Sequence, residues 1–228
     1  MHYFPNSSGH PMQTSNMQTL DPLQPTTQQT IAYVIGDKLY LNITDKCTLR
    51  CNFCPKYNGS HQVHEYDLSL HHKPSAQDVI NAITDYGDVT QFKEVVFCGY
   101  GEPTLRLKEL LTIAKHIKDK GGRLRLNTDG LANRVHKRNV LPELAQYLDA
   151  VSVSMNAQNA AVYEQHCCPS LADSYPAMLD FLKQAPNYIA DVTATAINGL
   201  EGVDIEQCAA LAHQLAVKFR ARQLDVVG

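Results

Sequence analysis

Residues 39–55 read LYLNITDKCTLRCNFCP, and this stretch decides how the whole chain is interpreted. Its first half is apolar and rich in β-forming residues, which predicts a buried strand over residues 39–44. Its second half places Cys47, Cys51 and Cys54 at C-x3-C-x2-C spacing in the loop that follows. Three thiolates on one short loop can converge on a single metal centre, so the sequence predicts a metal site directly after the first strand.

The number of cysteines in this loop limits the kinds of centre that it can hold. An ordinary [4Fe–4S] cluster takes four cysteines. A cluster on only three leaves one iron open for a substrate or cofactor, and Phe53 would then pack over the cluster or over an aromatic ring. A closed zinc site takes four nitrogen or sulfur ligands. The alternative is therefore a Cys3His zinc site completed by one of His61, His64, His71 or His72 in the 55–74 loop; otherwise these histidines are surface residues.

Beyond the cysteine loop, short β-rich runs alternate with helix-like segments. The predicted strands are residues 39–44, 94–98, 123–127, 150–154, 189–197 and 217–222, several of them nearly continuously apolar, as buried parallel strands are. Helices are predicted from Ser75, over 107–117 with a stop at Gly121 and Gly122, and over 140–148, 157–166, 173–185 and 204–216. Asp204 and Gln207 fit a capping box at the start of the last helix.

Six strands alternating with helices predict an α/β fold with a parallel sheet and right-handed crossovers. About thirty residues per strand and helix is the size of a βα unit. Both a partial (β/α)6 barrel and an open doubly wound sheet fit this pattern. In either architecture ligands bind at the carboxyl ends of the strands, so the residues just after each strand are the candidates for a site.

The second strand runs into a glycine-rich turn, residues 98–104, which read CGYGEPT. Glycine lets the backbone approach a ligand closely. Glu102, at the end of the strand, could bind a cationic ammonium group together with free backbone carbonyls. The alternative for this turn alone is a tight bend with a solvated glutamate.

Short polar side chains follow the third and fourth strands. Asn127 and Asp129 could reach a ribose hydroxyl, or could simply form an Asx-type turn before Gly130. Ser154 and Asn156 are candidates for cofactor contact, since Ser152 and Ser154 share one face of their strand. The segment 197–200 could lie behind an adenine ring or be an ordinary Asn-Gly turn.

Taken together, the C-x3-C-x-aromatic-C loop and the Tyr100-Gly101-Glu102 segment resemble the radical S-adenosylmethionine (SAM) superfamily. The resemblance implies a partial (β/α)6 barrel of the TIM type. It also implies one [4Fe–4S] cluster on Cys47, Cys51 and Cys54, and SAM bound by Tyr100, Gly101 and Glu102, with Phe53, Asn127, Asp129, Ser154 and Asn156 nearby. This sequence departs from the superfamily at Tyr100, where a Gly-Gly-Glu motif has its first glycine.

The wider set of motifs over residues 30–227 resembles the TatD-associated radical SAM proteins. The resemblance implies an enzyme that generates a 5′-deoxyadenosyl radical, a flavodoxin- or ferredoxin-like electron donor, and a functional link to a TatD-type nuclease. The short chain suggests a large substrate or partner that closes the open side of the barrel. A glycyl-radical-enzyme activase has the same cysteine spacing and is the alternative enzyme; a zinc-stabilised adaptor is the alternative that is not an enzyme.

The ends and the charge of the chain set further expectations. Residues 1–30 are rich in Gln, Thr and Ser, which predicts a disordered tail before a core domain over residues 31–228. With 20 Lys and Arg against 23 Asp and Glu the net charge is −3, which does not indicate a broadly basic nucleic-acid-binding surface. No membrane span or export signal is visible, so we expect a cytoplasmic protein with reduced thiols. Of the remaining cysteines, Cys98 and Cys208 are expected in the core, and Cys167 and Cys168 have no assigned role.

Overall fold

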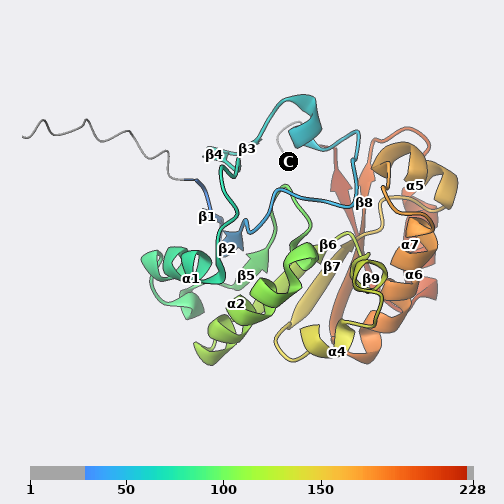
Figure 1. Ribbon diagram of the computed structural model, residues 1–228. Coiled ribbons are helices and arrows are strands. Elements are labelled where there is room, and N and C mark those ends of the chain that lie inside the picture. The colour runs from blue at the N-terminus through green and yellow to red at the C-terminus, as the bar shows by residue number, and fades with distance from the viewer. Residues whose placement is uncertain (1–28, 225–228) are drawn as a thin grey trace, which may run out of the picture.

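A computed structural model describes residues 29–224 (Figure 1). Most of the tail predicted over residues 1–30 lies outside the described residues. At its end, Gln29 is already buried, and its side-chain oxygen accepts hydrogen bonds from the backbone N–H groups of His71 and His72, at 3.0 and 3.2 Å. Thr30 accepts a bond from Asn42, so both residues pack on the domain.

One sheet of seven strands forms the centre of the domain. Its strands lie in the order β1-β2-β5-β6-β7-β8-β9, and all neighbouring pairs are parallel except β1 with β2. The bounds are β1 Ala32–Ile35, β2 Lys38–Leu41, β5 Glu94–Phe97, β6 Leu124–Thr128, β7 Ala150–Ser154, β8 Asp191–Asn198 and β9 Lys218–Gln223. The six parallel strands follow one another in space as in sequence, as a partial (β/α)6 barrel requires, and the predicted fold class is confirmed.

Helices connect the parallel strands and cover the outer face of the sheet (Figure 1). Their bounds are α1 Ala76–Asp85, α2 Leu107–Asp119, α3 Ala132–His136, α4 Leu141–Leu144, α5 Ala160–Cys167, α6 Ser174–Gln184 and α7 Ile205–Gln214. Short 3₁₀ turns add η1 Pro55–Asn58, η2 Val89–Gln91, η3 Pro103–Arg106 and η4 Ala185–Asn187. Ser75 caps α1 in a reciprocal capping box with Asp78, which explains the start of that helix.

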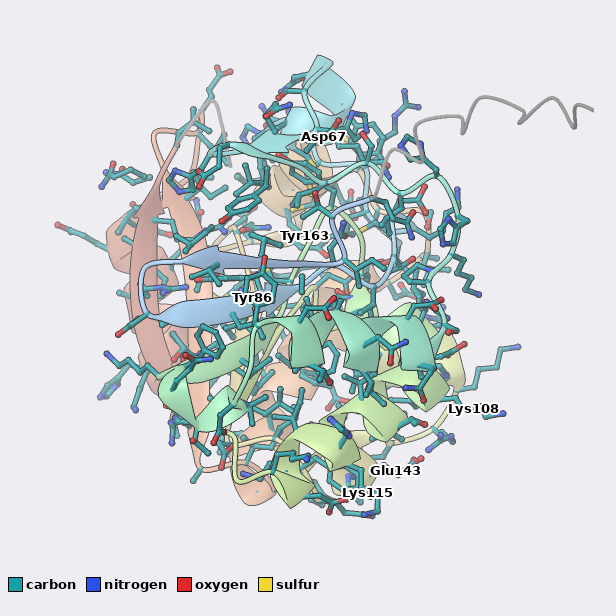
Figure 2. The ribbon with its side chains drawn as sticks, turned by 90° about the vertical axis from the view of Figure 1, so that its left-hand side faces the viewer. Asp67, Tyr86, Lys108, Lys115, Glu143 and Tyr163 are labelled. Carbon is teal, nitrogen blue, oxygen red and sulfur yellow. The ribbon has the colours of Figure 1, made fainter. Side chains whose placement is uncertain are left out.

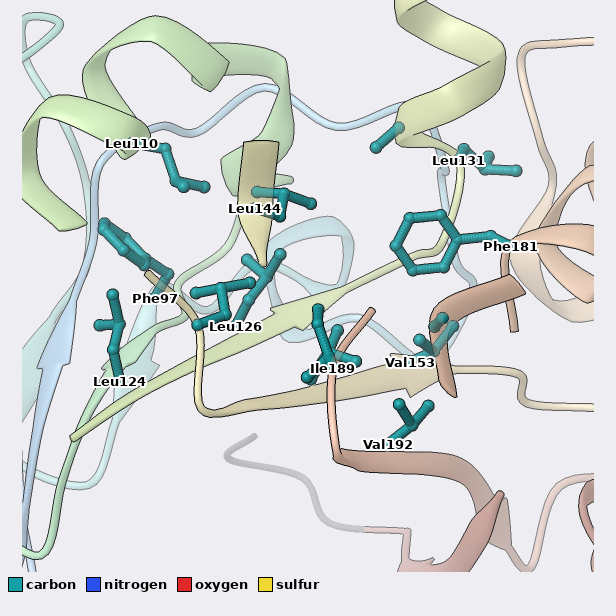
Figure 3. Packing of buried hydrophobic residues seen from close by; sticks show 14 of the residues in the cluster. Phe97, Leu110, Leu124, Leu126, Leu131, Leu144, Val153, Phe181, Ile189 and Val192 are labelled. Carbon is teal, nitrogen blue, oxygen red and sulfur yellow. The ribbon is translucent and has the colours of Figure 1, made fainter. Parts of the chain in front are cut away.

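The main core lies between the sheet and these helices. Alternate strand residues such as Leu39, Phe97, Leu126 and Val153 point to this side and are fully buried. Figure 3 shows Phe97, Leu110, Leu126 and Leu144 packed together beside the strands, with Phe181 and Val153 further along the same layer. The apolar periodicity of the predicted helices therefore faces the apolar half of each strand.

Some boundaries differ from those predicted. The strand predicted over residues 39–44 is β2, and it ends at Leu41. Its end coincides with Asn42, whose side chain donates to the carbonyls of Thr30 and Leu68, both at 3.0 Å. The capping box predicted at Asp204 is only half formed. Gln207 donates to Asp204 through both its backbone and its side chain, while the Asp204 N–H donates to Gln158.

Several elements were not predicted from the sequence, among them the short helix α3 and two hairpins. Strand β1 pairs with β2 in a hairpin, and Tyr86, after α1, donates to the Ala32 carbonyl at 3.2 Å (Figure 2). The 55–74 loop contains a second hairpin, β3 Gln62–Val63 with β4 Tyr66–Asp67. Its side chains join Tyr33, Tyr40 and Tyr100 in a small apolar cluster over the inner face of β1 and β2.

Within residues 29–224, no helix has the length and apolar character needed to cross a membrane.

Candidate metal centre

The loop that carries the three cysteines runs from β2 to η1 across the carboxyl ends of the strands. The end of α5 and the residues after it hold this loop in place. The backbone N–H of Arg50 donates to Cys167 O at 3.0 Å, that of Asn52 donates to His166 O at 2.9 Å, and that of Ser170 donates to Thr48 O at 2.9 Å. The cysteine loop is therefore fixed by strand-like pairing with a segment more than a hundred positions away in the sequence.

Backbone N–H groups lie close to two of the three sulfur atoms. Leu49 N–H donates to Cys47 Sγ at 3.4 Å, and the N–H groups of Lys56 and Tyr57 act to lower the pKa of the Cys54 thiol, although Tyr57 N–H itself donates to Cys54 O at 3.0 Å. Such donors stabilise negative charge on sulfur and tune iron–sulfur centres. Burial, with the nearby Asp129 carboxyl, raises the pKa of Cys47 to about 12, and burial also raises the pKa of Cys54. Without a metal these thiols are protonated, and a bound cation would deprotonate them.

Cys51 lies against Cys167, a contact that the spacing of the cysteines does not predict. The Cys51 thiol donates a hydrogen bond to the Cys167 sulfur, which together with burial raises the pKa of Cys51 and lowers that of Cys167. Asn156 donates to the same Cys167 sulfur at 3.5 Å. Cys208 is buried on α7 as predicted, and Cys98 is only partly buried just after β5.

Among the described residues, no group of three or more His, Cys, Asp or Glu side chains is arranged as a ready metal site. None of the four loop histidines joins the cysteines. His71 and His72 lie beside Gln29, and His61 packs edge-on against the Tyr100 ring with centroids 6.1 Å apart. The loop cysteines therefore lack the histidine that a closed Cys3His zinc site needs. This favours an iron–sulfur cluster on the three loop thiols, with the Cys167 thiol next to Cys51.

The Glu102 carboxylate is buried and accepts hydrogen bonds from protein groups on two loops. It accepts from Thr104 N–H at 3.0 Å, the Thr104 hydroxyl at 2.6 Å, the Thr128 hydroxyl at 2.8 Å and Asp129 N–H at 2.7 Å. Burial, followed by the charge of Asp129, raises the pKa of Glu102 to about 8. Glu102, which the sequence predicted to bind an ammonium group, thus links the loops after β5 and β6 through hydrogen bonds and caps η3.

The glycines after β5 pack against protein. A Cβ on Gly99 would lie 2.3 Å from Asn42 Oδ1, and one on Gly101 would lie 2.3 Å from Thr44 O and 2.6 Å from Lys46 O. Glu102 N–H also donates to Lys46 O at 2.7 Å. These glycines let the β5 loop lie flat against the start of the cysteine loop, so they have a packing role whether or not a ligand also approaches them.

Asp129 forms the predicted Asx turn, since its carboxylate accepts from Leu131 N–H at 2.9 Å. The Thr48 hydroxyl of the cysteine loop donates to the other Asp129 oxygen. Gly130, at φ +80°, leaves no room for a side chain beside Val153 and Met178. Three successive loops are thus linked through Thr48, Asp129 and Glu102 beneath the cysteines.

Several buried polar atoms at this end of the sheet have no hydrogen-bond partner within residues 29–224. They include Asn127 Oδ1, Asn156 Oδ1 and the Tyr163 hydroxyl. Asn127 pairs in register with Ser152 on the inner face of the sheet, and Asn156 follows β7 with a positive φ of 60°. Buried polar atoms are nearly always paired, so these unpaired atoms at the carboxyl end of the sheet indicate room for a polar group that the described residues do not supply.

Tyr163 on α5 was not among the predicted site residues. Its ring is fully buried in the interior (Figure 2), and burial, with Cys167 and Asp129 next in effect, raises the pKa of its phenol. Its sequence context, an amphipathic helix, indicates only a core position. The unpaired hydroxyl and its proximity to the cysteines are visible only in the structure.

A hollow of about 370 Å³ opens beside the cysteine loop. Phe53 and Asn52 line it from that loop, His166 from α5, and Leu200 from the turn after β8. His166 is fixed by the Glu201 carbonyl at 2.7 Å. The structure therefore brings Phe53 together with the 197–200 segment, two sites that the sequence singled out separately.

Comparisons with known proteins agree with this geometry. A family model described as the radical SAM superfamily matches residues 41–215. The chain is 29% identical over 119 residues to the tungsten-containing aldehyde ferredoxin oxidoreductase cofactor-modifying protein of Pyrococcus furiosus. That alignment covers 52% of this chain and 30% of the relative, so the chain spans about three tenths of the relative's length.

Solved structures share the fold at low sequence identity. Streptococcus suis SuiB bound to S-adenosylmethionine matches with a TM-score of 0.61 at 14% identity, over 83% of this chain and 41% of SuiB. TYW1 with a lysine-pyruvate adduct bound gives 0.57 at 14% identity, over 82% and 64%. Methylornithine synthase (PylB) gives 0.57 at 11% identity, over 82% and 53%.

The family model covers most of the chain, from the end of β2 through the cysteine loop to α7. The fold and the cysteine loop both agree with it, and the chain belongs to the radical SAM superfamily of enzymes.

Proposed function

We propose that this chain is a radical SAM enzyme in which Cys47, Cys51 and Cys54 hold one [4Fe–4S] cluster with SAM at the open iron. When bound, the cluster and SAM together supply a 5′-deoxyadenosyl radical that takes a hydrogen atom from the substrate. The observation that carries the proposal is the cysteine loop. Three thiols lie on one loop that backbone hydrogen bonds hold in place, Cys47 Sγ accepts a backbone N–H bond, and among the described residues no histidine joins them.

The chain's own residues would hold and orient SAM. The Glu102 carboxylate is occupied by protein donors, so the backbone carbonyls of Tyr100 and Gly101 are left for the methionyl ammonium group. The unpaired Asn127 and Asn156 oxygens are acceptors for the remaining polar groups, with Ser154 beside them. Asp129 supports this end of the site through Thr48 and the Asx turn.

Phe53 and Leu200 line the hollow beside the cysteine loop and suit the adenine ring. Apolar side chains there would also keep water away from the reacting groups.

The likenesses suggest the class of substrate. The Pyrococcus furiosus relative is a cofactor-modifying protein, and one SuiB structure holds its precursor peptide SuiA. We infer a large substrate or partner, consistent with a small core whose sheet is open at the β9 edge. A flavodoxin- or ferredoxin-like electron donor, a cytoplasmic location and a link to a TatD-type nuclease belong to the same proposal.

Anaerobic iron–sulfur reconstitution tests the proposal. The wild-type chain should take up about four iron atoms and, with dithionite and SAM, release 5′-deoxyadenosine. Cys51→Ala should lose both properties. Cys208→Ala is the matched control, because it removes a buried thiol on α7 away from the loop and should keep both.

The other outcomes are also informative. Uptake of zinc without iron would overturn the proposal and favour a zinc-stabilised adaptor. Full iron uptake with SAM left intact, even with the electron donor and candidate substrates present, would also contradict it. A gene for a glycyl radical enzyme beside this one would favour an activase, and a TatD-type nuclease gene there would support the TatD link.

A further inference from the structure

The inner face of the sheet carries more basic than acidic side chains. Strand register places the side chains of Lys38, Glu94, Arg125, Asp191 and Lys218 on this face, at the amino ends of the strands. Further along β9 from Lys218, Arg220 pairs with Thr195 and Arg222 pairs with Ile197. Their side chains lie on the same face of the sheet. Phe219, on the opposite face of β9, packs against the main core instead.

The lower charges neutralise one another. Glu94 accepts from Arg125 at 2.8 Å and lies 3.3 Å from Arg123 and 3.6 Å from Lys38. Asp191 lies 3.2 Å from Lys218 and 3.4 Å from Arg123. Glu94 and Asp191, the two acidic residues of the parallel strands on the inner face, are therefore both paired with basic side chains at the amino ends of the strands.

Arg220 and Arg222 lie nearer the carboxyl ends of the strands than these ion pairs do. Within residues 29–224 neither forms an ion pair with an acidic side chain. Both residues are exposed, because the sheet is open at the β9 edge. The Arg222 guanidinium nevertheless faces the protein: burial lowers its pKa, Cys98 and Cys51 act to raise it, and the charge of Arg220 acts to lower it. The charge of Arg220 also reaches Tyr40 on β2, where it acts to lower the pKa of the phenol.

Side chains two positions apart on one strand lie about 7 Å apart, so both guanidinium forks can converge on one anionic group. Guanidinium groups bind carboxylate and phosphate through paired N–H donors.

We propose that Arg220 and Arg222 bind an anionic group, carboxylate or phosphate, of a substrate inside the barrel, so that the rest of the substrate points toward the cysteine loop. This proposal rests on the proposed function, because it names the substrate class for that same barrel. The two arginines are binding residues that anchor the substrate at a distance from the reacting atoms.

The test is titration of the cluster-loaded full chain with inorganic phosphate and, separately, with succinate, followed by the arginine Nε–Hε resonances and by calorimetry. We expect saturable binding of one of the two probes, which also distinguishes a phosphate from a carboxylate substrate. The double variant Arg220→Gln/Arg222→Gln should bind that probe at least about tenfold more weakly, since it loses charge-assisted hydrogen bonds. Arg134→Gln removes one positive charge on α3, outside the barrel, where the double variant removes two, and it should bind within about twofold of wild type.

The proposal would be overturned if the double variant bound the probe as tightly as wild type, or if Arg134→Gln lost as much affinity as the double variant. It would also be overturned if SAM displaced the anion competitively, because the arginines would then bind the carboxylate of SAM. Arg220→Lys/Arg222→Lys should recover part of the binding, and thermal unfolding checks that each variant is folded. Because no SAM is present in the titration itself, anion binding without SAM cleavage would refute only the proposed function. SAM cleavage without anion binding would refute only this inference.

Discussion

The two faces of one sheet are built from alternating residues of the same strands, yet they differ in almost every physical respect. On the helix-covered face, Leu39, Phe97 and Leu126 are fully buried in a continuous apolar core. On the inner face, Arg125, Asn127 and Ser152 occupy the neighbouring positions, and the buried Asn127 oxygen has no partner among the described residues. One face of this sheet therefore forms the apolar core, and the other leaves a buried polar atom unpaired, as the proposed cofactor site requires.

The sharpest test of that contrast uses adjacent residues on β6. Leu126→Ala should lower the free energy of unfolding by about 2–5 kcal/mol, because it empties a fully buried site. Asn127→Ala should cost less than about 1 kcal/mol, because the oxygen that it removes is unpaired. Urea unfolding of the cluster-free variants measures both, and equal losses would mean that the inner face is an ordinary core.

The two faces meet at the carboxyl edge of the sheet, where Gly101 packs against the cysteine loop. Gly101→Ala should cost about 1–3 kcal/mol, since its Cβ would lie 2.3 Å from Thr44 O and force the loops apart. It should also lower the iron content after reconstitution. Gly36→Ala, in the β1–β2 turn with open space around it, carries only the strain of a positive φ and should keep normal iron uptake. Normal iron content in Gly101→Ala would show that this packing does not shape the site.

The pH dependence of stability tests the Glu102 network. Because the pKa of Glu102 is raised to about 8, the native state retains a proton that the unfolded chain loses above pH 4.5. The stabilisation of the native state by this proton is complete below pH 4.5 and is lost as pH rises toward 8. The free energy of unfolding should fall by at most about 1.4 kcal/mol per pH unit over this range. Thermal unfolding between pH 5 and 8 should show this decline.

Two variants separate Glu102 from other carboxylates in that experiment. Glu102→Gln should remove the decline. Glu109→Gln should leave it in place, because Glu109 pairs with Arg106 at 2.8 Å and its pKa is lowered. A decline that persists in Glu102→Gln would assign it to another group.

The smallest expected effect concerns the buried Tyr163 hydroxyl. In the cluster-free protein Tyr163→Phe should be neutral or stabilising by up to about 1 kcal/mol, because it removes an unpaired polar atom. If the hydroxyl donates to a bound group, the same change should destabilise the loaded protein. Differential scanning calorimetry of the cluster-free and loaded proteins measures the sign of the stability change in each form. Tyr175→Phe is the control: its hydroxyl donates to Ala157 O at 3.4 Å, and its effect on stability should have the same sign in both forms.

Much of the fold followed from local patterns. The six parallel strands and the helices between them were visible as apolar runs and amphipathic spacing, because buried strands and half-buried helices must show those periods. Strand β1 was missed because a short run beside a polar tail carries no such signal, and it is defined only by pairing with β2.

Spacing along the chain was enough to locate the three cysteines, the alternation of strand and helix, and the residues at the strand ends. The contacts of those residues depend instead on the tertiary structure. It turned Glu102 toward Thr104 and Thr128, set Cys167 against Cys51, and left Arg220 and Arg222 without acidic partners among the described residues. Such contacts join segments far apart in sequence, so they depend on how the barrel closes, and no local pattern encodes them.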